Sequence, residues 1–341
     1  MLRHKIINIL AFIKAKLDQY TDFIKQRSAN FSKVSFDIII ICIVGFLFLY
    51  YPVGAYLTDK INRDTNIEIN ATQTNQSQTI DMISYLIHQE INEKIWTPNL
   101  PFFFPAAILD NMPNYQLGMI NGISKFTTAF ERRIDIKINN KENTSPLYKA
   151  AALLRYPGTI WMFSPRNKIK PVPSAASQYR KARRMLGKYN QLLAGGQVPF
   201  YKSPQDLAYI LDKARLNLAR SDSQLSASVR ENSSNWFDFK ADDVFYYNQG
   251  KIYAYYMILK ALGYDYKQTI LQANQYQNWI SLLKALEDAC KIQPQYVRNG
   301  ELSGSFAPNH LAYLNMYTQK AQSLLRIITE TLTKIPTESS K

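Results

Sequence analysis

The sequence from Ile38 to Leu57 reads IIIICIVGFLFLYYPVGAYL and contains no charged residue. Because an α-helix rises 1.5 Å per residue, a helix of this length extends about 30 Å, the thickness of the hydrocarbon core of a bilayer. Tyr50, Tyr51 and Tyr56 occupy its second half, and such amphipathic rings are enriched where a span meets lipid headgroups. The stretch therefore predicts one membrane-spanning helix over residues 38–57, with a large domain on one side of the membrane.

The charges on the two sides of this span predict its orientation. Residues 1–37 contain seven Lys or Arg and three acidic residues, whereas basic and acidic residues nearly balance over 58–68. The positive-inside rule then places the N-terminus in the cytoplasm and the residues after the span outside it. A cleaved signal peptide is the alternative, but its basic region is shorter and its apolar core is about 7 to 15 residues long. We therefore favour an uncleaved signal-anchor.

The rest of the chain divides by composition and pattern. Within residues 1–37, apolar residues recur every three or four positions between Ile6 and Ile24, which is the pattern of a basic amphipathic helix. We expect this leader to lie on the inner leaflet of the membrane, although packing on a partner protein would use the same pattern. Beyond the span we expect a polar linker over 58–78, a helical domain over 79–335 and a tail over 336–341.

The pattern of the domain is helical, and no strand-rich region occurs in it. Ser145-Pro146 joins an N-cap residue to a proline suited to the first helical position. From Asp242 to Leu262 apolar residues lie on nearly all sides, which predicts a central buried helix. From Leu311 to Leu332 they alternate three and four apart, the spacing of a helix-bundle seam. These patterns predict an all-α domain of about eight helices.

Cysteines and histidines are few. Cys42 lies within the span and Cys290 is alone in the domain, which excludes an intramolecular disulfide and a cysteine-rich metal site there. This usage fits a bacterial periplasmic domain better than a eukaryotic extracellular domain of the same size. The three histidines, His4, His88 and His310, are isolated, and the chain has no zinc-binding, nucleophile-elbow or phosphate-loop motif. The sequence therefore predicts no metal and no cofactor.

The positive charge of the domain is concentrated in one window. From Asn143 to Gln205 there are eleven Lys or Arg and no Asp or Glu, whereas the rest of the domain is balanced. Arg180, Arg184 and Lys188 recur every four residues, with Lys181 alongside, so they share one face of a helix. Such a row suits the phosphates or carboxylates of anionic lipid, lipopolysaccharide, the cell wall or an envelope protein. Nucleic acid is not expected, given the predicted topology. A merely solvated helix face is the alternative.

An acidic and aromatic segment follows the basic window. Trp236, Asp238, Asp242 and Asp243 lie close together in the sequence. Aromatic rings stack on sugar faces and carboxylates accept hydrogen bonds from hydroxyl groups, so the segment could form the floor of a pocket in a cell-wall or lipid-modifying enzyme. The structural alternative, which we favour, is a helix N-terminus capped by Asp242.

Two other candidates are weaker. Glu90 and Glu93, beside His88, could supply a general acid for glycan cleavage, but surface carboxylates on an amphipathic helix explain them as well. The loop from Trp96 to Pro105 contains three consecutive phenylalanines between prolines. It could insert into a membrane or a partner, but we favour a core position, because monomers seldom expose large apolar patches.

Several strings of the domain resemble one bacterial protein family. They are Trp236–Tyr246, Gly250–Tyr256, Asn99–Pro105, Asp110–Asn114, Tyr156–Gly158 and Pro308–Leu311. Together they are similar to domain-of-unknown-function family 2333 (DUF2333). The resemblance implies a bacterial inner-membrane protein with a single N-terminal anchor, and it implies no activity and no catalytic residue.

The combined expectation is a non-enzymatic scaffold or adaptor of the bacterial inner membrane. Its N-terminus is predicted in the cytoplasm and its domain in the periplasm. An enzyme with a site near Asp238, Asp242 and Asp243 is the alternative. The sequence indicates no oligomeric state.

Overall fold

The computed structural model describes residues 14–21, 33–68, 75–134, 145–164, 167–200, 202–231, 239–294, 296–297, 299 and 309–336. The chain divides into two compact units, Met1–Tyr56 and Leu57–Lys341, which are described separately. The predicted all-α class is confirmed, because helices make up nearly all of the regular structure in both units.

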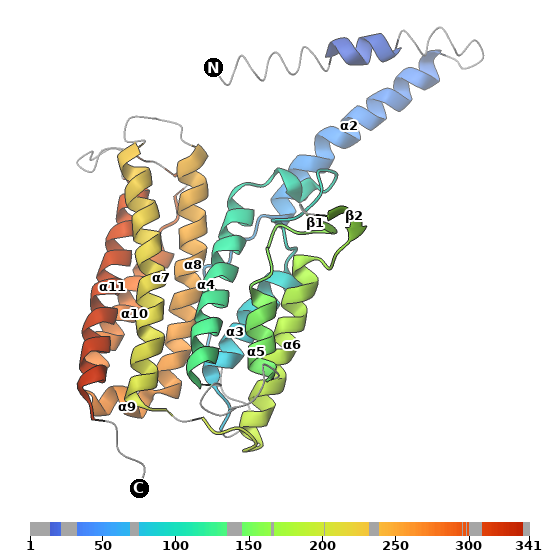
Figure 1. Ribbon diagram of the computed structural model, residues 1–341. Helices are drawn as coiled ribbons and strands as arrows, with labels where there is room; N and C mark the ends of the chain where they lie inside the picture. Colours follow the sequence, from blue (N-terminus) through green and yellow to red (C-terminus); the bar gives the residue numbers. More distant parts are fainter. Residues whose placement is uncertain are drawn as a thin grey trace. The chain divides into compact units, whose positions relative to one another are not determined.

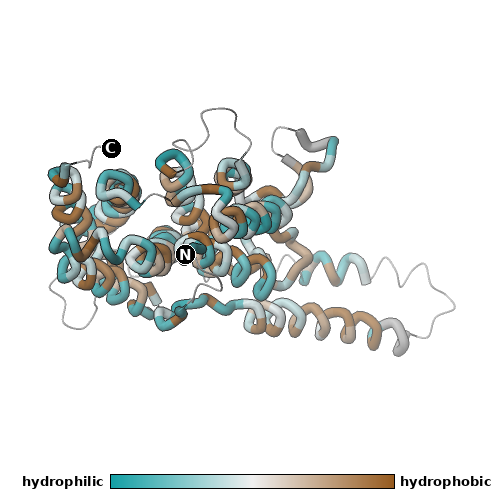
Figure 2. Tube along the Cα trace, turned by 90° about the horizontal axis from the view of Figure 1, so that it is seen from below, coloured by the Kyte–Doolittle hydropathy of each residue, from teal (hydrophilic) through white to brown (hydrophobic). Residues whose placement is uncertain are grey.

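The first unit contains the long helix α2 (Lys33–Thr58), whose last two residues belong to the second unit. Within Asp37–Thr58 the most apolar 18 residues have a mean hydropathy of 2.4, and only 6% of them are buried. By length and composition this helix can cross a membrane. Figure 2 shows it as a nearly continuous hydrophobic run. The leader helix predicted between Ile6 and Ile24 lies mostly outside the described residues, which include only its part over 14–21.

The second unit is a helical domain with one short hairpin (Figure 1). Its elements are α3 (Gln78–His88), the π-helical turn η1 (Gln89–Glu93), the 3-10 turn η2 (Pro105–Ile108), α4 (Asn111–Ile134), α5 (Pro146–Leu154), β1 (Phe163–Ser164), β2 (Asn167–Pro171), α6 (Ala175–Ala194), α7 (Pro204–Glu231), α8 (Phe239–Asp265), α9 (Lys267–Gln272), α10 (Tyr276–Cys290) and α11 (His310–Lys334). The two strands are antiparallel.

Helix α8 is the centre of this domain. It packs against α3 and α4 on one side and against α7, α10 and α11 on the other (Figure 1). Residues 252–259 of α8 are all buried, as its apolar pattern on all sides predicts. Helices α5 and α6 form a further pair that covers α3 and α4. The core is therefore continuous from α6 through α8 to α11.

At several helices of the domain a side chain caps the first turn. Ser77, Ser145, Ser174 and Asn309 each accept a hydrogen bond from a backbone N–H in the first turn of α3, α5, α6 and α11, respectively. These caps satisfy donors that would otherwise have no partner within the helix. The predicted start of a helix at Ser145-Pro146 is confirmed.

Helices α4 and α8 approach each other at two glycines. A Cβ atom added at Gly118 would lie 1.8 Å from the carbonyl oxygen of Tyr247, and one added at Gly250 would lie 2.1 Å from that of Tyr115. Real carbon and oxygen atoms do not approach this closely, so both positions require the absence of a side chain. The glycines allow the two backbones to come into direct contact.

A buried carboxylate joins the end of α8 to the start of α3. Asp265, which is 7% exposed, accepts hydrogen bonds from the Oγ atom of Ser77 at 2.6 Å and the Oγ1 atom of Thr79 at 2.6 Å. It also accepts from the backbone N–H groups of Gln78 and Thr79, at 3.0 and 3.1 Å. Asn190 of α6 also binds the backbone of Ser77: its Oδ1 atom accepts from the N–H group and its Nδ2 atom donates to the carbonyl oxygen. Three helices therefore meet at one polar centre.

The coil after α2 is held on the surface of the domain. The hydroxyl groups of Tyr115 and Tyr253 donate to the carbonyl oxygens of Asn62 and Asp64, respectively. Farther along α8, Lys260 donates to the carbonyl oxygen of Ile67 at 3.3 Å. The coil thus runs along α8 from the end of the domain where α4 begins.

Candidate functional site

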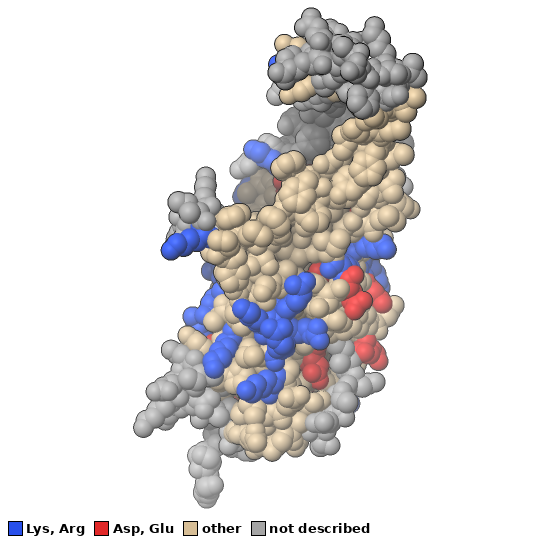
Figure 3. All heavy atoms as spheres, turned by 90° about the vertical axis from the view of Figure 1, so that its right-hand side faces the viewer, with Lys and Arg blue, Asp and Glu red and all other residues tan. Residues whose placement is uncertain are grey.

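The basic residues of α6 lie on its outer side. Tyr179, Ala182, Leu186 and Tyr189 of this helix are fully buried, and α6 packs on α3 and α5. The opposite side is therefore directed to solvent. Arg180, Lys181, Arg184 and Lys188 are all exposed there, and we call these four residues the basic face. Figure 3, which views the α6 side of the domain, shows Lys and Arg side chains gathered on it.

Most of the basic face has no acidic partner within the described residues. Arg180 donates to the backbone carbonyl oxygen of Ile91 at 3.1 Å, which orients its guanidinium group. The ion pairs of the described part of the chain involve other cations, and none of them joins Lys181, Arg184 or Lys188. The positive charge of this face is therefore not neutralised by the described carboxylates around it.

Arg183, which the four-residue spacing leaves out of the row, lies on a different side of α6. Its Nη1 atom is 2.8 Å from Nδ1 of His88, and Nε2 of His88 is 2.9 Å from Oε1 of Glu93. This chain of contacts connects α6 to α3 and η1. Arg183 is therefore a packing residue between helices and not part of the basic face.

The interpretation of Glu90 as a surface carboxylate is wrong. Glu90 is 1% exposed, and its two oxygens accept hydrogen bonds from Lys94 at 2.6 Å and from Gln116 at 3.0 Å. Gln116 in turn accepts from the backbone and side chain of Thr97. The network connects η1 to the loop after it and to α4. A π-helical turn places Glu90 inward, and the regular amphipathic pattern does not predict such a turn.

The acidic residues at the start of α8 meet a third carboxylate from another part of the chain. Asp242 and Asp243 lie beside Asp110, which precedes α4, and Asn114 of α4 donates to Oδ1 of Asp243 at 2.6 Å. Because α8 begins at Phe239, Asp242 lies within the first turn, and its predicted role as the N-cap is wrong. The other two members of the predicted site, at positions 236 and 238, lie outside the described residues.

Burial and mutual repulsion raise the pKa values of this cluster. Burial is the main cause for Asp242, and the charge of Asp110 adds to it, so the pKa rises to about 6. Burial also leads for Asp243, whose pKa rises to about 6 with contributions from a hydrogen bond to Asp110 and from both neighbouring charges; Asn114 opposes the shift. The cluster therefore carries fewer than three charges under mildly acidic conditions.

Asp243 also lines a cleft of about 450 Å³ between α4, α7 and α8. Asn248 lies in its wall, is 1% exposed and donates to the carbonyl oxygen of Val244 at 2.8 Å. The Oδ1 atom of Asn248 has no hydrogen-bond donor among the described residues. No group of three described His, Cys, Asp or Glu side chains could hold a metal ion. The polar side chains that line this cleft are one carboxyl group, one lysine ammonium group, hydroxyl groups and neutral amides, so it offers hydrogen bonding and charge interactions.

The cluster predicts that stability falls as the pH rises from about 4 to about 7. The ordinary pKa of an Asp carboxyl group, which applies in the unfolded chain, is 3.8, whereas Asp242 and Asp243 have a folded pKa of about 6. The folded state therefore binds more protons between these values, and its advantage is lost as the pH passes through about 6. The unfolding free energy of D242N minus that of wild type should therefore increase as the pH rises from 4 to 7. Urea unfolding of the full chain at these pH values measures the difference.

The matched control is D288N on α10, where the carboxylate is partly exposed and pairs with Lys284. D288N should change the pH dependence of the unfolding free energy less than D242N does. If the D242N difference is constant from pH 4 to 7, the proposed proton uptake by the cluster is wrong.

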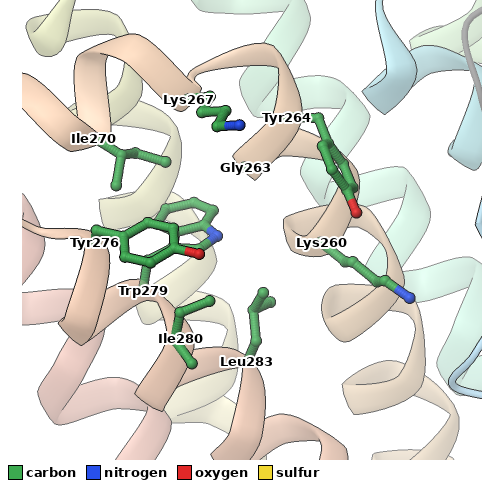
Figure 4. Close-up of a pocket in the computed structure, with 9 residues that line it drawn as sticks. All are labelled: Lys260, Gly263, Tyr264, Lys267, Ile270, Tyr276, Trp279, Ile280 and Leu283. Atoms are coloured by element: carbon green, nitrogen blue, oxygen red, sulfur yellow. The ribbon is translucent and has the colours of Figure 1, made fainter.

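The domain also has a pocket of about 290 Å³ where α8, α9 and α10 meet (Figure 4). Trp279 and Tyr276 form its floor, and Lys260 and Lys267 stand at its edges. Gly263 makes room for the indole, because a Cβ atom there would lie 2.5 Å from Nε1 of Trp279. The apolar pattern predicted a helix only as far as Leu262, yet α8 includes Gly263 and continues to Asp265. Pattern analysis found no signal for this pocket.

Sequence analysis also missed a buried lysine. Lys251 is 3% exposed, donates to Oγ of Ser221 at 3.1 Å and lies over the ring of Tyr247. Burial, followed by the charges of Arg220 and Lys125, lowers its pKa to about 8. The only sequence signal for this buried lysine is its position in an apolar helix, because a charged group in a central helix must find a polar partner.

The comparisons with known proteins give one match. Residues 205–334 match the model of a family described as an uncharacterized protein conserved in bacteria (DUF2333). The match includes the strings over 236–246, 250–256 and 308–311, whereas the strings before residue 205 lie outside it. It does not test the membrane anchor. No curated protein and no solved structure matches the chain. The part of the chain from α7 to α11 thus carries the DUF2333 signature, and the resemblance recognised in the sequence is confirmed for residues 205–334.

Proposed function

We propose that this protein is a single-pass, non-enzymatic adaptor of the bacterial envelope that binds an anionic surface through the basic face of α6. The observation that carries this proposal is the exposed row of Arg180, Lys181, Arg184 and Lys188 on a helix whose other side is buried. The packed side fixes the position of the helix, so the cations are displayed without any rearrangement. Binding by such a face costs little conformational entropy apart from the side chains themselves.

The spacing of the basic face suits a ligand with regularly placed negative charges. Arg184 and Lys188 are one turn apart, so their Cα atoms are separated by about 6 Å along the axis. Phosphates of lipid headgroups or lipopolysaccharide and carboxylates of cell-wall peptides provide such charges. Each Lys or Arg near an anionic membrane surface contributes about 1 kcal/mol, and the contribution falls with added salt. Binding should therefore weaken steeply as the salt concentration increases.

The proposed location is the bacterial inner membrane. Helix α2 would be the anchor, with the N-terminus in the cytoplasm and the helical domain in the periplasm. The length and hydropathy of α2 and the excess of Lys and Arg before it support this arrangement. In this location the available anions are lipid, lipopolysaccharide, cell wall and acidic envelope proteins, and not nucleic acid.

Charge reversal of the basic face tests the proposal. The triple variant K181E/R184E/K188E leaves Arg180 and its contact with Ile91 intact. We expect it to weaken binding of the full chain to anionic vesicles or lipopolysaccharide by about 100-fold or more, because three favourable charges of about 1 kcal/mol each are lost. The full-length protein is held in zwitterionic nanodiscs, and its co-sedimentation with anionic vesicles or lipopolysaccharide is measured at low and physiological salt.

The matched control is K320E/R326E/K334E, which reverses three exposed cations on α11. It changes the net charge by the same amount at a different face of the domain. Wild-type binding by this control, together with loss in the α6 variant, supports the proposal. Equal loss in both variants would mean that only the net charge matters, and no loss in either would contradict the assignment of the basic face.

A further inference from the structure

The loop from Trp96 to Pro105 is divided between the core and the surface. Trp96 is 4% exposed, and its indole donates to the carbonyl oxygen of Gly158 at 2.8 Å. In contrast, Phe102, Phe103 and Phe104 are 83%, 49% and 36% exposed. The predicted core position is therefore wrong for the three phenylalanines, and the sequence pattern alone did not separate them from Trp96.

A second exposed segment lies against these phenylalanines. Trp161, Met162 and Phe163 lead into β1 and are 37%, 40% and 46% exposed. The ring centroids of Phe103 and Trp161 are 6.2 Å apart in an edge-to-face contact. Asn99 holds the two segments together by donating to the carbonyl oxygen of Ile160 at 2.7 Å. We call the six exposed residues the aromatic patch: Phe102, Phe103, Phe104, Trp161, Met162 and Phe163.

The aromatic patch belongs to the end of the helical domain that directly follows α2 in the chain. The turn η2 joins the patch to the start of α4, where the hydroxyl group of Tyr115 donates a hydrogen bond to the carbonyl oxygen of Asn62. The helix α2 ends at Thr58, so only three residues lie between its end and Asn62, and the Cα atoms of Thr58 and Asn62 are at most about 14 Å apart. Within the domain, the hairpin and the first turn of α4 lie at one end and α9 at the other (Figure 1).

We propose that the aromatic patch inserts into the headgroup region of the same bilayer that α2 spans. This inference rests on the proposed anchoring and adds a second membrane contact, made by the domain itself. The occupant is a lipid surface because the patch combines Trp, Phe and Met, the amphipathic and apolar side chains that partition into membrane interfaces. The short connection to the anchor keeps that surface continuously within reach.

The charges of the hairpin are compatible with a lipid surface, whereas the carboxylates of Asp110, Asp242 and Asp243 lie farther on, at the starts of α4 and α8. The hairpin that follows Trp161 belongs to the window from Asn143 to Gln205, which contains no acidic residue. Exposed Lys170 on β2 adds a cation to the hairpin. Anionic headgroups attract such a combination, whereas an acidic hairpin would be repelled.

The test places spin labels on the full chain in nanodiscs of mixed zwitterionic and anionic lipid. C42S removes the exposed cysteine, and buried Cys290 remains. Labels at F102C and F163C replace exposed side chains, so the fold is not expected to change. Their accessibility to lipid-soluble oxygen and to a water-soluble nickel complex reports depth. We expect both labels about 5 to 10 Å into the headgroup and acyl boundary.

Two further labels separate the possible outcomes. L271C on α9 is an exposed apolar position at the opposite end of the domain and should report water. V44C in α2 tests the anchor itself, since Val44 is 45% exposed within the apolar stretch. Lipid exposure at V44C with water exposure at F102C and F163C overturns the inference and leaves the anchor intact. Water exposure at V44C overturns the anchoring. If neither oxygen nor the nickel complex reaches the labels at the aromatic patch, a protein partner covers the patch, and the inference of membrane insertion is again overturned.

Discussion

G118A is expected to lower the free energy of unfolding by about 3 kcal/mol or more. The added Cβ atom would lie 1.8 Å from the carbonyl oxygen of Tyr247 and 2.7 Å from its carbonyl carbon. These are backbone atoms of a buried helix, so no side-chain rotation relieves the overlap. Helices α4 and α8 would have to separate, and α8 also packs against α3, α7, α10 and α11.

The same argument applies to G250A, whose Cβ atom would lie 2.1 Å from the carbonyl oxygen of Tyr115. The matched control is G187A in α6, where an added Cβ atom meets nothing within 4 Å. Since Ala is the better helix former, this control should gain up to about 1 kcal/mol. Urea unfolding of the full chain, followed by circular dichroism, compares the three variants. Wild-type stability of G118A and G250A would show that the two backbones are not in direct contact.

The second large effect is expected for D265A, which removes the acceptor shared by the start of α3. Two backbone N–H groups and the hydroxyl groups of Ser77 and Thr79 donate to this carboxylate. Buried donors that lose their partner cost about 1 to 3 kcal/mol each before relaxation. Because the removed group is also an anion at the positive end of the α3 dipole, we expect a total loss of about 3 to 5 kcal/mol.

Hydrogen exchange tests the location of this effect as well as its size. In D265A, the backbone N–H groups of Gln78 and Thr79 should exchange much faster than in wild type, because their acceptor is absent. D288A on α10 is the control, since that carboxylate pairs with exposed Lys284 and its removal should cost less than about 0.5 kcal/mol. Equal losses in the two variants would mean that Asp265 does not organise the start of α3.

The sequence determined the features that depend on local pattern. The uncharged run of Ile38–Leu57 indicates α2, because the hydrophobic length of a span is a property of consecutive residues. The start of α5 follows from Ser145 and Pro146, since a cap acts within one turn. The four-residue spacing on α6 placed its row of cations on one face and left out Arg183, because helical periodicity alone sets which residues share a side.

Tertiary structure decided which surfaces of these helices meet and which remain exposed. Asp110 joins Asp243 from more than a hundred positions away, and Asp265 caps α3 from a similar distance in the chain. Phe102 and Trp96 belong to one aromatic loop, yet one side chain is exposed and the other is buried. An amphipathic pattern predicts that a helix has a buried side, but it does not predict which other helix covers that side. That choice depends on the packing of the whole core, which only the three-dimensional arrangement of the helices defines.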